Sequence, residues 1–174
     1  MLKRLFAALA LASLTACAST PPNPLTAQER AGVFVEGVST AWSVEDGRRA
    51  ENPNYLEGKA DMQQRLTAAV QQAFANSPAG SEAVEFVVDV KNYNRVGMAQ
   101  TALIGGANMV IGDVTVRRKS NGETLAVYQG VLGSHVPPAG VLGLAVTAAM
   151  RPDPVGIMAN NFAKNLRARW DAAK

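Results

Sequence analysis

The side chains of this chain that could do chemistry are few and far apart. Its 174 residues include one histidine, His135, and one cysteine, Cys17. Nucleophilic catalysis needs a base beside the nucleophile, most often a histidine. Ser134 precedes His135, but neighbouring residues of a strand point to opposite faces. We therefore interpret His135 as an ordinary loop or strand-end residue, and we predict that the protein is not an enzyme.

Metal and cofactor sites have equally little support in the sequence. With one His and one Cys, only scattered carboxylates remain as ligands, and Glu45-Asp46 is typical of solvated loop charges. Gly105-Gly106 with Gly112 matches neither the dinucleotide-binding fingerprint nor the phosphate-binding loop. We predict no metal ion and no cofactor.

The first seventeen residues have the pattern of a secretory signal. Lys3-Arg4 precedes an apolar run over 5–14, which is too short for a permanent membrane span. The string Leu14-Thr15-Ala16-Cys17 resembles the lipobox of bacterial lipoproteins. That resemblance implies cleavage before Cys17, a diacylglycerol thioether on its sulfur and an acyl chain on its new amine. The alternative is that Cys17 is a small residue of a conventional signal peptide.

The remaining domain is nearly neutral. Removal of Lys3 and Arg4 leaves 15 basic against 14 acidic side chains, so we expect no nucleic-acid partner. Cys17 is followed by Ala18-Ser19, without the Asp that resembles an inner-membrane retention signal. The resemblance then implies the outer membrane of a Gram-negative bacterium, on its periplasmic face.

Three regions follow from this interpretation. Residues 1–16 are the cleaved signal peptide, 17–30 are the lipidated cysteine and an extended tether, and 31–174 are a single globular periplasmic domain. Three prolines within 21–24 favour an extended chain, which at about 3.1 Å per residue gives the tether a reach of roughly 40 Å.

Hydrophobic periodicity predicts the elements of the domain. Alternating or apolar runs predict strands over 33–42, 84–90, 109–116 and 124–132. Helical spacing predicts one helix after Asn54, a candidate N-cap, and a last helix after Asp153-Pro154. The order β-α-β-β-β-α predicts a two-layer α/β (α+β) sandwich, with a mixed or antiparallel sheet of about four strands and helices on one face.

A second resemblance covers residues 113–125, which read Asp-Val-Thr-Val-Arg-Arg-Lys-Ser-Asn-Gly-Glu-Thr-Leu. They resemble a strand-turn-strand of small Gram-negative envelope lipoproteins, in which the turn commonly reads Thr-Gly-Glu. With the element order, the body is loosely similar to domains related to the curli-secretion lipoprotein and to activators of peptidoglycan synthases. This resemblance implies no functional residue beyond Cys17.

Residue types indicate candidate surfaces for a partner. Aromatic and basic side chains are enriched at binding hot spots, and the candidates are Trp42, Tyr93, Arg95, Arg117, Arg118 and Lys119. The last three are predicted at a hairpin tip, where they could meet phosphates or acidic protein, or protect a sheet edge. Residues 96–112 and 140–150 are rich in small or apolar residues, which suits either buried packing or an interactive surface.

The sequence therefore predicts a non-enzymatic lipoprotein of the outer membrane. It would bind the membrane through its lipid and an envelope protein through its domain, in envelope assembly, transport or maintenance. Two alternatives remain: a self-assembling secretion or transport component in which 96–112 inserts or oligomerises, and an envelope enzyme acting on peptidoglycan or lipid. The sequence leaves the oligomeric state open.

Overall fold

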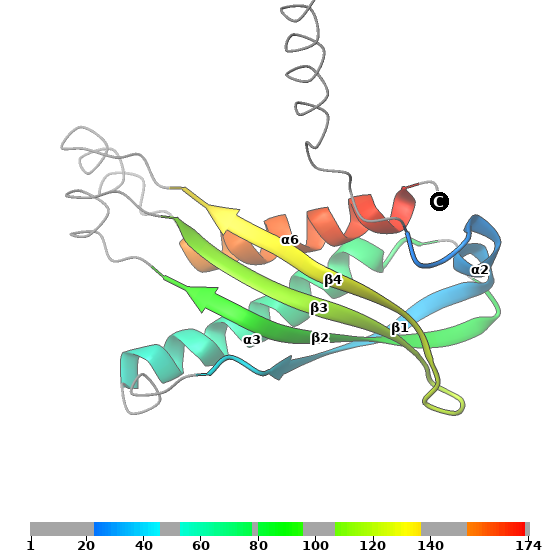
Figure 1. Ribbon diagram of the computed structural model, residues 1–174, viewed down its shortest axis with the longest axis horizontal. Helices are drawn as coiled ribbons and strands as arrows, with labels where there is room; N and C mark the ends of the chain where they lie inside the picture. Colours follow the sequence, from blue (N-terminus) through cyan, green and yellow to red (C-terminus); the bar gives the residue numbers. More distant parts are fainter. Residues whose placement is uncertain (1–22, 46–52, 78–79, 96–106, 137–152, 173–174) are drawn as a thin grey trace, which may run out of the picture.

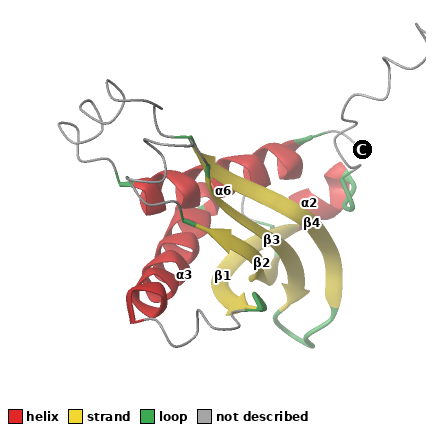
Figure 2. Cartoon of the chain, turned by 60° about the vertical axis from the view of Figure 1, so that its left-hand side comes forward, coloured by secondary structure: helices red, strands yellow, loops and turns green. Residues whose placement is uncertain are grey.

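The computed structural model describes residues 23–45, 53–77, 80–95, 107–136 and 153–172 (Figure 1). The elements are α2 (Ala27–Gly32), β1 (Val33–Trp42), α3 (Pro53–Phe74), β2 (Glu82–Asn94), β3 (Asn108–Arg118), β4 (Thr124–His135) and α6 (Pro154–Asp171). Among the described residues, four strands form a mixed sheet in the order β1-β2-β3-β4, with β1 parallel to β2 and the other pairs antiparallel. Helices α3 and α6 cover one face (Figure 2). The predicted two-layer sandwich is confirmed.

Strict alternation along β2 builds the centre of the core. Val84, Phe86, Val88 and Val90 are fully buried beneath the helices, as expected for a strand whose side chains alternate between faces. The alternation shifts at a bulge between Val90 and Asn92, and a similar bulge in β4 contains Gly130 at a φ of 60°. Each bulge adds a residue and re-aims the strand beyond it.

Both helices present one apolar stripe to this sheet. As predicted, α6 has Asp153 as its N-cap, whose Oδ1 accepts from the Gly156 N–H at 3.0 Å, and Pro154 in its first turn. Helix α3 begins at Pro53, so Asn54 lies inside the first turn and the predicted N-cap is wrong. Proline suits a first turn because its missing N–H would have no intrahelical partner there. The buried stripes are Met62, Leu66, Val70 and Phe74 on α3, and Val155, Met158, Phe162, Leu166 and Trp170 on α6.

Polar side chains of α6 cover the outer edge of β4. Asn161, Asn165 and Arg169 follow one another at intervals of four residues and share one face of the helix. They donate to the carbonyl oxygens of Ser134 (2.8 Å), Leu132 (2.7 Å) and Gln129 (2.5 Å), respectively. An uncovered edge strand is a template for unwanted strand pairing, so this ladder protects the sheet on the β4 side.

The predicted extended tether is wrong from Asn23 onward. Asn23 is 3% exposed, and its Nδ2 lies 2.9–3.0 Å from the carbonyl oxygens of Arg169, Trp170 and Ala172 at the end of α6. Its Oδ1 accepts from the Tyr128 hydroxyl at 2.8 Å. The last carbonyls of a helix lack intrahelical donors, and the Asn23 amide supplies one.

The segment after Asn23 is also part of the folded body. Leu25 is buried in the core, and α2 begins with a capping box in which Thr26 and Glu29 satisfy each other's backbone N–H. A capping box and a buried anchor favour a short helix over an extended chain. The folded body therefore starts eight residues earlier than the predicted boundary at residue 31.

Gly133 allows α6 to approach β4 closely. A Cβ at this position would lie 2.1 Å from the Met158 carbonyl oxygen and 2.9 Å from the Phe162 Cβ. We expect Gly133→Ala to lower the free energy of unfolding by about 1–3 kcal/mol through overpacking, measured by urea denaturation. Gly37→Ala is the control, because its Cβ would meet nothing within 4 Å. Equal effects of the two substitutions would contradict this packing.

Asn23→Ala tests the contact between Asn23 and the end of α6. It leaves the buried Tyr128 hydroxyl and three carbonyls short of a partner, so we expect a loss of about 1–3 kcal/mol in unfolding free energy. Asn160→Ala, on the exposed side of α6, should change it little. If the Asn23 contact did not contribute to folding, both variants would have the same midpoint of urea denaturation.

Candidate functional surfaces

The six predicted partner residues lie in two groups, near opposite ends of β2. Trp42 pairs with Val90 at the end of β1, and its ring meets that of Tyr93 edge-on at 5.4 Å between centroids. Arg118 instead pairs with Val84, near the start of β2. At about 3.3 Å per residue, Val84 and Tyr93 are roughly 30 Å apart. The six residues therefore do not form one surface.

In the aromatic group, Tyr93 belongs to the core. It is 3% exposed, and burial raises the pKa of its hydroxyl although the charge of Arg95 lowers it. Trp42 is half-buried, with the Lys59 ammonium 5.3 Å from its ring centroid. Arg95 is exposed. A partner at this end would meet Arg95 and one side of Trp42, and Tyr93 would support them from beneath.

In the basic group, carboxylates neutralise two of the three cations. Arg118 forms ion pairs with Glu82 and Glu123, of which the Glu82 hydrogen bond raises the Arg118 pKa most. Lys119 pairs with Glu36 at 2.7 Å. Arg117 is exposed and lies opposite Glu85 of β2. This pairing argues against a phosphate site, which needs uncompensated positive charge. The edge-protecting interpretation is wrong for Arg117 and Arg118, because β3 lies between β2 and β4.

A polar groove of about 800 Å³ adjoins the aromatic group. It is lined by Ser43, Val44, Glu45, Lys91, Asn92, Tyr93, Asn94 and Met109. Beside it, Asp89 and Asp113 stand directly opposite each other on β2 and β3. Like charges in such a pair destabilise a sheet, but Lys91 binds Asp89 at 2.5 Å and the Gly130 N–H donates to Asp113 at 2.8 Å. The groove offers amides, a hydroxyl and balanced charges.

The electrostatics of Asp89 favour its charged form. Burial raises the pKa of this carboxyl. Hydrogen bonds from Lys91 and Ser43, together with the Lys91 charge, lower the pKa by more than burial raises it, so it lies below its ordinary value. A general acid at neutral pH needs the opposite shift. Among the described residues, no group of three His, Cys, Asp or Glu side chains is placed to hold a metal ion.

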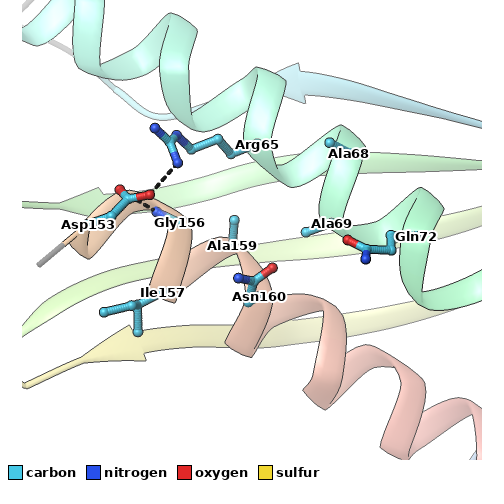
Figure 3. A pocket seen from close by; sticks show the side chains of 9 residues that line it. All are labelled: Arg65, Ala68, Ala69, Gln72, Asp153, Gly156, Ile157, Ala159 and Asn160. Carbon is cyan, nitrogen blue, oxygen red and sulfur yellow. Dashed lines mark hydrogen bonds and ion pairs between the residues drawn. The ribbon is translucent and has the colours of Figure 1, made fainter.

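A second groove, of about 390 Å³, lies between α3 and α6 (Figure 3). Arg65 and Asp153 point toward each other across it and form an ion pair, and Asp61 binds Arg65 at 2.6 Å. The Asp61 hydrogen bond is the main cause that raises the pKa of Arg65. The remaining lining residues are Ala68, Ala69, Gln72, Gly156, Ile157, Ala159 and Asn160. Because two carboxylates hold its guanidinium, this groove has no spare charge for an anion.

The face of the sheet away from α3 and α6 carries apolar side chains in two rows, with Asp89 and Asp113 in the row between them. Strand pairing aligns Ser39, Val87, Thr115 and Val127 in one row, and Asn92, Ile111 and Leu132 in another. Val127 and Leu132 are each 39% exposed. A sheet packed on one side ordinarily places polar residues on the other. We name Val87, Ile111, Val127 and Leu132 the open-face patch.

Sequence reasoning missed the open-face patch although a signal was present. Val87 and Ile111 stand between buried neighbours in the uninterrupted apolar runs 86–88 and 109–111. Apolar residues on both faces are typical of strands covered on both sides. The sequence alone does not show that these residues lie near one another, because this depends on the strand pairing that places Ile111 opposite Leu132.

Several predicted features lie outside the described residues. These are the signal peptide over 1–16, Cys17, residues 96–106 of the small-residue segment, and 140–150. Of the other candidates, His135 ends β4 and is half-buried, and Glu45 is exposed at the polar groove. In the described part of the chain, no helix combines the length and apolarity needed to cross a membrane.

Comparison with known proteins finds only distant structural likeness. No protein-family model matches the chain, and no curated protein matches it. A candidate lipoprotein from Caulobacter crescentus CB15 is 14% identical, with 63% of this chain and 80% of that one covered and a TM-score of 0.40. PelC from Paraburkholderia phytofirmans, solved as a dodecamer, is 15% identical over 86% and 93%, with a TM-score of 0.40. Lipoprotein GNA1162 from Neisseria meningitidis is 14% identical over 68% and 94%, with a TM-score of 0.28.

Lys91→Gln tests the charge balance beside the polar groove. Loss of the ammonium should raise the pKa of Asp89, measured by NMR titration of its carboxyl. A depressed carboxyl pKa stabilises the fold above the unfolded value of about 3.9, and this stabilisation is lost as the pH falls through the folded pKa. Wild type should therefore lose more stability than Lys91→Gln between about pH 5 and pH 3.

Lys164→Gln, an exposed lysine on α6, is the matched control and should follow wild type. If Lys91→Gln showed the wild-type pH dependence, Lys91 would not be what lowers the Asp89 pKa.

Proposed function

We propose that the chain is a lipoprotein of the outer membrane, facing the periplasm, that binds an envelope protein in assembly, transport or maintenance and catalyses no reaction. The observation that carries the proposal is the string Leu14-Thr15-Ala16-Cys17 at the end of a signal, six residues before Asn23, which is buried and is the first residue that the structure describes. Each buried lipid methylene contributes about 0.8 kcal/mol, so several acyl chains hold a protein durably where one does not. No cofactor is invoked.

The open-face patch supports a protein as the partner. Protein interfaces have an apolar centre, depleted in charge, within a polar rim. Val127 and Leu132 are apolar and each 39% exposed. Asp89 and Asp113 stand in the row between them and are engaged by Lys91 and by the Gly130 N–H, respectively. Anionic lipids are recognised instead through uncompensated positive charge, whereas Lys91 at the larger groove is bound to Asp89 and Arg65 at the smaller groove is bound to Asp61 and Asp153. The helix-free face is therefore the proposed site of the envelope protein.

Support for a non-enzymatic role comes from the carboxylates. The envelope-enzyme alternative calls for two carboxylates in a cleft, one with a raised pKa that lets it act as a general acid. Asp89, beside the larger groove, has a lowered pKa and is held by Lys91. Asp61 and Asp153 at the smaller groove are bound to Arg65.

Crosslinking in cells tests the proposal. The C-terminally tagged protein is captured, and its crosslinked partners are identified by mass spectrometry for wild type, Cys17→Ser and the pair Val127→Lys and Leu132→Lys. Both apolar residues are 39% exposed, so lysine there should not disturb the core. We expect one recurrent envelope protein with wild type, and its loss in Cys17→Ser and in both lysine variants.

Asn160→Lys is the matched control for the added charge. It lies on the opposite layer, at the groove between α3 and α6, and should capture as wild type does. If Asn160→Lys lost the partner while Val127→Lys and Leu132→Lys kept it, the partner would bind the helical face instead. Self-crosslinks alone would favour the self-assembly alternative, and glycan or lipid fragments alone would favour the enzyme.

A further inference from the structure

We propose that the surface around Asn23 faces the membrane, so that the far end of β1 and the polar groove point away from it. This inference rests on the proposed lipid on Cys17 and adds an orientation to it. The membrane-facing surface consists of Pro24, the start of α2, the end of α6 and the Gln129-Gly130 bulge of β4. Its partner is a phospholipid surface.

The first argument is the length of the leader, by which we mean the segment from Cys17 to Asn23. Only six residue steps separate Cys17 from Asn23, and a fully extended chain spans at most about 3.6 Å per step, or roughly 22 Å in all. Asn23 itself cannot swing away, because its amide is bound to Arg169, Trp170 and Ala172 and to the Tyr128 hydroxyl. The lipid must therefore lie close to this part of the surface.

The second argument is the shape of the domain. β1 starts beside α2 and runs from Val33 to Trp42, which is about 30 Å at 3.3 Å per residue. In Figure 1 the described chain begins near the end of α6, and the end of β1 lies toward the opposite end of the molecule. A leader of at most roughly 22 Å is shorter than this strand, so the domain cannot turn freely above the bilayer.

The third argument is the charge of this surface. Arg30 donates to the carbonyl oxygen of Leu25 (2.6 Å), and Arg169 donates to that of Gln129 (2.5 Å). Because a carbonyl oxygen carries no net charge, both arginines keep their full positive charge. Glu29 is engaged in the capping box, and Asp171 is bound to Arg167 at 2.8 Å. Three arginines against two carboxylates give a small positive excess, which suits anionic headgroups.

Site-specific quenching tests the orientation. The lipidated protein is purified, the mass of its Cys17 peptide is measured, and it is reconstituted into phosphatidylethanolamine–phosphatidylglycerol vesicles that carry a headgroup-linked quencher. Gln28→Cys on α2 and Ala41→Cys near the end of β1 are both exposed and each carries a thiol dye. We expect strong quenching at position 28 and weak quenching at position 41.

The matched control lengthens the leader. Twenty Gly/Ser residues inserted between Pro22 and Asn23 raise the mean span to roughly 30 Å, so the difference between the two positions should be lost. Equal quenching with the native leader would overturn the orientation. A difference that survives the insertion would overturn the role of the leader.

The mass measurement separates this inference from the proposed function. A Cys17 peptide without lipid would overturn both. A lipidated peptide with equal quenching at positions 28 and 41 would overturn the orientation alone.

Discussion

Trp170 is the side chain on which the rest of the fold depends. Its ring meets Phe74 of α3, Phe86 of β2 and Tyr128 of β4 at centroid distances of 5.6, 5.4 and 6.1 Å, and its carbonyl oxygen accepts from Asn23. Aromatic pairs contribute about 0.5–1.5 kcal/mol each beyond their buried area. Because Trp170 stands in the last turn of α6, it joins the helices, the sheet and the N-terminal leader at one point.

Among the described residues, helices cover one face of the sheet, and this has consequences for its other surfaces. Helix α6 covers the sheet and also binds the outer edge of β4 through Asn161, Asn165 and Arg169. No equivalent cover lies over Val127 and Leu132 among the described residues. The molecule thus protects the β4 edge against uncontrolled strand pairing. It leaves apolar side chains exposed on the face away from α3 and α6, where a partner of complementary shape can bind.

The sequence predicts what depends on local pattern. The strand at 84–90 and the Asp153-Pro154 start of α6 are predicted correctly, because strand period and capping act within a few residues. The role of Asn23 could not be predicted, since its partners at the end of α6 and in β4 lie 105 to 149 residues away and nothing in a Pro-rich segment indicates them. The division of the predicted partner residues follows from strand direction: parallel β1 and β2 bring Trp42 to Tyr93, whereas antiparallel β3 ends with Arg117 and Arg118 at the opposite end.

One buried amide changes what the leader can do. A tether extended to residue 30 would reach roughly 40 Å, about the length of the 13-residue strand β2, and the domain could then present any face to the bilayer. With Asn23 fixed on the end of α6, only six residue steps remain, and spacing in the sequence becomes a restriction on orientation. The same contact links this restriction to folding, because Tyr128 and the last carbonyls of α6 need Asn23 for their hydrogen bonds. Anchoring geometry and stability of the domain therefore rest on the same residue.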